Sequence, residues 1–147
     1  MATVNDLLIR ARRRLGDMQK LKLSDPELID ALNDAIDALS GKLILEKEPE
    51  MIKTLTLTNT TAVARPSEFI AFVGQYPVQF ITDAQGAVTI KHLDSAFSGT
   101  LEVRYFAAKN KIAALSDTVP FSRIAHQTML VDNTVSSFAQ NAAAPKA

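Results

Sequence analysis

The stretch SDPELIDALNDAIDALSGKL, residues 24–43, predicts a well-capped amphipathic helix. Ser24 is placed to accept a hydrogen bond from the backbone N–H of Glu27, and the Glu27 side chain to accept one from the N–H of Ser24, which is a capping box. Pro26 falls in the first turn, where its missing N–H costs nothing. Apolar residues then recur at helical spacing and predict a stripe that faces a core. The stripe consists of Leu28, Ile29, Leu32, Ala35, Ile36 and Leu39.

Charge is divided unevenly around this helix. Asp30, Asp34 and Asp37 form an acidic stripe on another of its faces. Residues 1–22 hold six Lys or Arg and two Asp, a net charge of +4, whereas residues 23–50 hold two Lys and eight Asp or Glu, a net charge of −6. Two interpretations stay open. The charged faces are solvated and partly pair between the helices, or they contact neighbouring subunits or other partners in an assembly.

A shorter helix is expected before the capped one. Thr3 or Asn5 is a suitable N-cap for a helix that runs to about Leu15, and Gly16 suits its C-terminal end. Its last turns carry basic side chains, which interact favourably with the helix dipole at the C-terminus. The same side chains are candidates for a contact with a neighbouring subunit or with DNA. The residues concerned are Arg10, Arg12, Arg13 and Arg14. Two amphipathic helices joined by a short loop predict an antiparallel hairpin over residues 1–45.

The middle of the chain changes to strand patterns. Residues 50–106 contain about five alternating or short apolar runs, and their short connections predict mostly antiparallel pairing. The runs are Ile52–Thr58, Phe69–Val73, Val78–Thr82, Ala87–Lys91 and Thr100–Phe106. Asp83–Gly86 lies between two of them and is a hairpin signal.

The chain then returns to a helical pattern. A helix is expected over residues 120–139, opened by Pro120 or Ser122, and residues 140–147 are small and polar, which predicts a mobile tail. The fold class is therefore α+β in a single domain, residues 1–147. We expect the N-terminal hairpin and the C-terminal helix to form a helical bundle, with the small β region inserted between them.

Composition sets limits on function. The 147 residues are 47% hydrophobic and 22% charged, with a formal net charge of zero, which argues against a bulk nucleic-acid binder. The chain contains no cysteine and no apolar run near the roughly 20 residues needed to cross a bilayer, so we expect a cytosolic origin and no membrane partner. The charges at the N-terminus follow the apolar residues, the reverse of a secretory signal.

No pattern of catalytic residues stands out. His92 and His126 lie on different elements and are expected at the surface or in loops rather than on a metal. Ser122, His126 and Asp132 all fall on one predicted helix, which does not build a nucleophile turn or an oxyanion hole. Consecutive turns of a straight helix also gather metal ligands poorly, and the glycines make no phosphate-binding motif. We therefore expect neither an enzyme nor a cofactor or metal site.

Several motifs follow one another along the chain. VNDLLIRARRRLGD occupies residues 4–17, and an "L-x-x-x-L-N-x-A" core runs from Leu28 to Ala35. RPSEFI follows at residues 65–70, then an Asp and a Pro near Asp117 and Pro120, and a final helix with a histidine. In this order of elements the chain resembles the tailed-bacteriophage head-to-tail adaptor, or connector, proteins.

This resemblance implies a structural virion protein rather than an enzyme. Such proteins form a homo-oligomeric ring under the portal protein, extend the channel for packaged DNA and provide a platform for tail or nozzle proteins. The implied location is the virion neck, after synthesis in the host cytoplasm. Asp30, Asp34 and Asp37 are then candidates for a channel or inter-subunit face. The candidates for portal docking are Phe138, Gln140, Asn141, Pro145 and Lys146. The alternative is a small nucleic-acid-binding or regulatory module that uses the basic run Arg12–Arg14.

Overall fold

The computed structural model describes residues 2–20 and 22–143, and the side chains within these ranges up to residue 138. The chain divides into two compact units. One unit joins the two ends of the chain, residues 1–43 and 109–147, and the other is residues 44–108. The β region is therefore inserted into a helical unit, and the fold is mixed α+β with three α-helices and six strands in the described residues.

Helix α1, Val4–Leu15, opens the helical unit and is capped at both ends. The Thr3 side chain accepts a hydrogen bond from the N–H of Asp6, and the Asp6 carboxylate accepts one from the N–H of Thr3. The chain leaves the helix at Gly16, whose φ of 70° lies in the left-handed region that glycine adopts without strain. Thr3 is thus the N-cap, and α1 ends where the sequence predicts.

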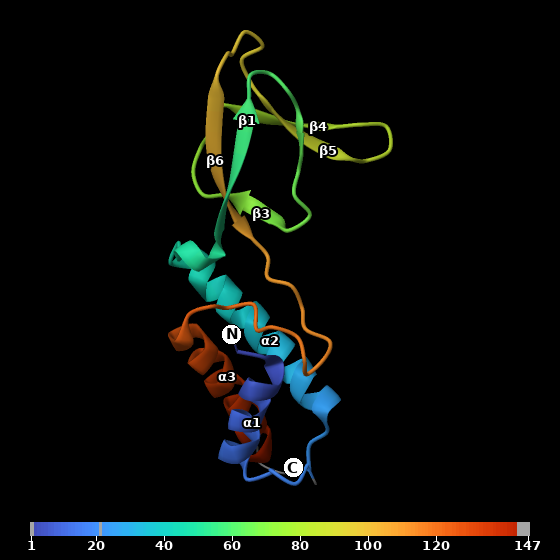
Figure 1. The fold of residues 1–147 in the computed structure, drawn as a ribbon, viewed down its shortest axis with the longest axis vertical. Helices are drawn as coiled ribbons and strands as arrows, with labels where there is room; N and C mark the ends of the chain where they lie inside the picture. The colour runs from blue at the N-terminus through green and yellow to red at the C-terminus, as the bar shows by residue number, and fades with distance from the viewer. Residues whose placement is uncertain (1, 21, 144–147) are drawn as a thin grey trace. The chain divides into compact units, whose positions relative to one another are not determined.

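Helix α2, Asp25–Leu45, is the capped helix expected from the sequence. The N–H of Glu27 donates to Ser24 Oγ at 3.3 Å, which is one of the two bonds of the expected capping box. The apolar stripe faces the core except for Ile29, which is half-buried. Helix α3, Ile124–Ala143, completes this unit and lies beside α1 (Figure 1). Because α1 approaches α3 more closely than it approaches α2, the expected bundle around an α1–α2 hairpin is not confirmed.

The bounds of the last helix differ from the predicted 120–139. Phe121 is fully buried, and its carbonyl accepts a hydrogen bond from the Gln127 side chain at 2.8 Å, so residues 120–123 form an anchored entry to the helix rather than its first turn. At the other end α3 continues to Ala143, so residues 140–143 are helical instead of part of a tail.

The core of the helical unit is built from all three helices and from the segment that precedes α3. Its buried apolar residues are Val4, Leu7, Leu8, Ala11, Leu28, Leu32, Ala35, Ile36, Leu39, Leu43, Ile112, Val119, Phe121, Leu130 and Val131. The segment before α3 also completes the N-terminus of α1. The N–H of Val4 donates to the Asp117 carbonyl at 2.8 Å, and that of Asn5 donates to the Leu115 carbonyl at 2.9 Å. These bonds satisfy donors that a helix leaves free at its start.

The β unit begins with a short 3-10 helix, Pro49–Met51, and holds two three-stranded antiparallel sheets. The first has the order β1-β6-β3, and the second the order β2-β5-β4. The strands are β1 (Ile52–Thr58), β2 (Val63–Ala64), β3 (Phe69–Phe72), β4 (Val78–Thr82), β5 (Val88–His92) and β6 (Thr100–Ala107). The expected region of about five strands is therefore replaced by six. The extra strand, β2, is only two residues long and shows no alternation from which to predict it.

Aromatic side chains fill part of the β unit. The Phe69 ring lies 5.0 Å from that of Phe72 and 5.8 Å from that of Phe80, measured between ring centroids. Tyr105 lies against Phe69 at 5.5 Å, and its hydroxyl donates to Glu68 Oε1 at 3.0 Å. Burial and the neighbouring carboxylate raise the pKa of the Tyr105 hydroxyl. Contacts among β3, β4 and β6 thus join the two sheets of this unit.

Candidate functional site

Arg12, from the basic run of α1, is buried. Its side chain is 3% exposed, and the guanidinium donates to Asp17 Oδ2 at 3.1 Å and to Asp25 Oδ1 at 2.7 Å. It also donates to the Leu23 carbonyl at 2.8 Å. These partners lie in the connection between α1 and α2 and in the first turn of α2, so Arg12 holds that connection in place. The prediction of Arg12 as an inter-subunit or DNA contact is therefore wrong, because the group is desolvated and bound within its own chain.

The two carboxylates around Arg12 have different environments. Asp17 is 4% exposed and accepts hydrogen bonds from the backbone N–H groups of Lys22 and Leu23, each at 3.0 Å. Asp25 is partly exposed and also pairs with Lys20 at 3.3 Å. The hydrogen bond from Arg12 is the main cause that lowers the pKa of Asp25. This cluster has the character of a structural ion-pair network, since each charge is matched by a partner in the same fold.

Burial of Arg12 has a signal in the sequence. Val4, Leu8 and Arg12 are spaced by four residues and lie on one face of α1, and Val4 and Leu8 are both buried. A cation in line with two core residues is expected to turn inward when an acidic partner is within reach. The basic run alone does not indicate which of its members faces the core.

The other arginines of the run lie on the surface. Arg10 donates to Thr128 Oγ1 at 3.3 Å, and Arg14 forms an ion pair with Asp132, so both contact α3. The Arg14 and Asp132 side chains are 49% and 52% exposed, which leaves their pairing weak. Arg13 is exposed, and the ion pairs formed among the described residues do not include it. Arg10, Arg13 and Arg14 are hereafter the basic face of α1.

The acidic stripe of α2 faces outward. Asp30, Asp34 and Asp37 are all exposed, and within the described part of the chain they take part in none of the ion pairs. Asp34 also borders a shallow groove of about 310 Å³ between α2 and α3. This α2/α3 groove is lined by Ala31, Asp34, Ala35, Ala38, Asn133, Ser136 and Ser137. The structure thus combines a row of carboxylates with a recess whose other walls are small side chains.

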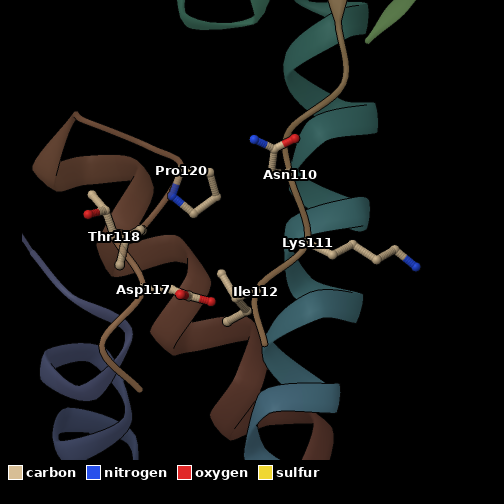
Figure 2. A pocket seen from close by; sticks show the side chains of 7 residues that line it. Asn110, Lys111, Ile112, Asp117, Thr118 and Pro120 are labelled. Atoms are coloured by element: carbon tan, nitrogen blue, oxygen red, sulfur yellow. The ribbon is translucent and has the colours of Figure 1, made fainter. Parts of the chain in front are cut away.

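A second pocket, of about 380 Å³, lies in the segment that leads into α3 (Figure 2). It is lined by Asn110, Lys111, Ile112, Asp117, Thr118, Val119 and Pro120. Figure 2 shows the Asp117 and Ile112 side chains facing each other, whereas the Lys111 side chain extends away from them. Asp117 Oδ2 accepts hydrogen bonds from the N–H groups of Ala113 and Ala114 at 2.8 and 3.0 Å. These bonds lower the pKa of Asp117, and through them the carboxylate stabilises the loop that leads into α3.

Asn33 of α2 binds the same segment. Its Nδ2 donates to the Ile112 carbonyl at 3.0 Å, and its Oδ1 accepts from the Ile112 N–H at 2.9 Å. The side-chain amide therefore satisfies both backbone groups of one residue, as a neighbouring strand would. The sequence pattern predicts no role for this asparagine beyond its place in the L-x-x-x-L-N-x-A motif. The available signal was a polar residue directly after the buried Leu32, at the border between the apolar stripe and the acidic stripe of the helix.

Both histidines are buried, contrary to the expectation of surface or loop positions. His92 is 7% exposed, stacks on Phe97 with ring centroids 3.9 Å apart, and accepts a hydrogen bond from the N–H of Asp94 at 2.9 Å. His126 is 6% exposed and forms an edge-to-face contact with Phe121, with ring centroids 6.0 Å apart. Asp132, the third member of the rejected triad, pairs with Arg14 on α1. In the part of the chain that the structure describes, no three His, Asp or Glu gather as a metal site.

The candidate portal-docking residues fall at the end of the chain. Phe138 is half-buried on α3, and Gln140 and Asn141 lie in the last helical turns. Pro145 and Lys146 lie outside the described residues. The structure therefore places three of the five on one helix.

None of the described helices has both the length and the apolar character required to span a membrane. Compared with protein-family models and with curated proteins, the sequence matches none of them.

Proposed function

We propose that this chain is a head-to-tail adaptor of a tailed bacteriophage, a structural protein of the virion neck. One observation carries the proposal: helices from both ends of the chain form one unit, and the β region is inserted between them. This is the order of elements on which the resemblance depends. In this role the chain forms a ring that docks under the portal protein, surrounds the DNA channel and receives tail or nozzle proteins.

The surface chemistry supports an assembly role. A closed ring requires two complementary faces on each subunit, and this chain has an exposed acidic helix face and an exposed basic one. A formal net charge of zero gives little overall repulsion between copies. Weak contacts are sufficient in such an assembly, because many copies dock together and their affinities combine.

Arg12 counts against the alternative of a nucleic-acid-binding module. That alternative relied on the basic run, and its central member is buried in an ion-pair network. The remaining exposed arginines lie without stacking aromatic rings among their described contacts, and single-strand binding usually needs such rings.

The experiment is electron microscopy of the purified chain mixed with portal rings assembled from the portal protein of the same genome. We expect a second ring stacked coaxially on the portal. A chain that binds no portal, and whose affinity for DNA falls steeply with salt, would instead support the nucleic-acid module.

Two variants test whether the C-terminal end of the chain docks on the portal. A truncation after Ala143 removes Pro145 and Lys146 and leaves α3 intact, and the double change Gln140→Ala with Asn141→Ala alters the last turns of α3. We expect both to weaken portal binding. Normal binding by both variants would place the docking surface elsewhere while leaving the adaptor role intact.

A further inference from the structure

The α2/α3 groove is a recess of the helical unit, and the contacts described above do not account for it. Small side chains line most of it, and Ala35 at its base is 5% exposed, so the walls are close to the backbone of both helices. Grooves of this kind let another helix approach closely. Asp34 lines the groove, and Asp30 and Asp37 lie one turn before and after it on the adjoining exposed face of α2. A helix with a basic face would complement both the small side chains and the carboxylate.

We propose that the α2/α3 groove binds the basic face of α1 from a second copy of this chain. The two surfaces are complementary in charge. The three carboxylates of α2 are exposed and take part in none of the ion pairs among the described residues. Arg13 on α1 is likewise exposed and belongs to none of these ion pairs. Arg10 and Arg14 lie beside it on α1. Arg10 donates a hydrogen bond to Thr128, and the ion pair between Arg14 and Asp132 is exposed to solvent and therefore weak. Each copy thus carries both halves of one contact.

The two halves lie on different surfaces of the same unit. Thr128 and Asp132 face α1, whereas Asn133, Ser136 and Ser137 face the groove, so α3 separates the basic face from the recess. A contact between unlike surfaces is heterologous, and repetition of it closes a ring when the rotation per copy divides a full turn. The inference therefore rests on the proposed adaptor function and adds the lateral contact that such a ring needs.

The test is a charge-exchange experiment on the full chain. Asp30→Arg with Asp34→Arg and Asp37→Arg reverses the groove side, and Arg10→Asp with Arg13→Asp reverses the α1 side. Analytical ultracentrifugation and electron microscopy, with and without portal rings, measure assembly. We expect each variant alone to weaken self-association about tenfold or more, because like charges then face each other. A mixture of the two variants should recover association, since reversed faces meet.

A control variant makes the same kind of acidic-to-basic change once, at another site. Glu46→Arg alters an exposed carboxylate just beyond α2 and should leave association unchanged. Circular dichroism of every variant confirms that the helices remain folded, and the association of the unaltered chain should weaken with added salt.

The outcomes separate this inference from the function on which it rests. Rings that form equally well in both reversed variants would overturn the proposed contact and leave the adaptor role standing. A groove-side variant that loses portal binding but keeps self-association would show that the groove receives the portal, which also overturns the proposal. Charge-dependent self-association without any portal binding would support the contact and refute the adaptor. A chain that never self-associates, with or without portal, refutes both.

Discussion

Arg12 on α1 and Asp25 in the first turn of α2 are joined by a hydrogen bond of 2.7 Å between Nη2 and Oδ1. The same guanidinium reaches Asp17 in the intervening loop, so one buried cation links two helices and the turn between them. A buried cation requires close partners, because removing it from water is costly. The pair therefore ties the start of α2 to the end of α1.

Replacing Arg12 by methionine tests this network. The change leaves the Asp17 carboxylate buried without its compensating charge, and we expect the free energy of unfolding to fall by about 3–5 kcal/mol. Urea denaturation at neutral pH measures the difference. Arg13→Met alters an exposed neighbour and should change stability by less than about 0.5 kcal/mol. Equal losses in the two variants would contradict the role assigned to Arg12.

Asn33→Ala removes both hydrogen bonds to Ile112. We expect a loss of about 1–3 kcal/mol, because partly buried backbone groups lose their partners. Hydrogen exchange at the Ile112 amide should accelerate at the same time. Asn33→Asp keeps an acceptor for the Ile112 N–H but has no donor for its carbonyl, so the amide should stay more protected than in the alanine variant. Asn5→Ala, at an exposed position, is the control. Unchanged Ile112 exchange in Asn33→Ala would refute the assigned contact.

Asp117 predicts a pH dependence. Its folded-state pKa is lowered by two backbone N–H donors, so its contribution to stability is complete above the ordinary Asp pKa of about 3.9 and is lost as the pH falls through the lower folded value. Asp117→Asn cannot titrate, and stability should therefore fall less steeply below about pH 5 than in the unaltered chain. Urea denaturation across this range measures the slope. An identical slope in both proteins would show that the carboxylate does not contribute.

The glycines provide a pair of opposite expectations. Gly16 has a φ of 70°, so Gly16→Ala forces a side chain into the left-handed region and should destabilise by about 1–2 kcal/mol. Gly41 lies within α2, and a Cβ added there meets nothing within 4 Å. Gly41→Ala should therefore stabilise by about 0.5–1 kcal/mol through helix propensity. Thermal unfolding of both variants checks the signs, and a shift in the same direction for both would contradict the assignment.

Local signals predicted the elements that have clear ends. Thr3 and Gly16 bound α1, and Ser24 marks the start of α2, because caps act over a few residues that are adjacent in sequence. The same kind of reasoning placed the start of α3 too early. Pro120 suits a first turn, but burial of Phe121 holds the chain in a different conformation until Ile124. The extra strand β2 was missed since two residues carry no period.

The sequence by itself therefore determined the succession of helix, helix, strands and helix, through caps, turn residues and apolar spacing. Tertiary structure alone decided which charged side chains are exposed and which are buried in ion pairs. Arg12 and Arg13 are neighbours of one kind, yet one is buried and the other exposed, because successive residues on a helix point to different sides. It also decided the role of Asn33, whose partner Ile112 lies 79 residues away. Such contacts depend on which segments meet after folding, and neither composition nor spacing contains that information.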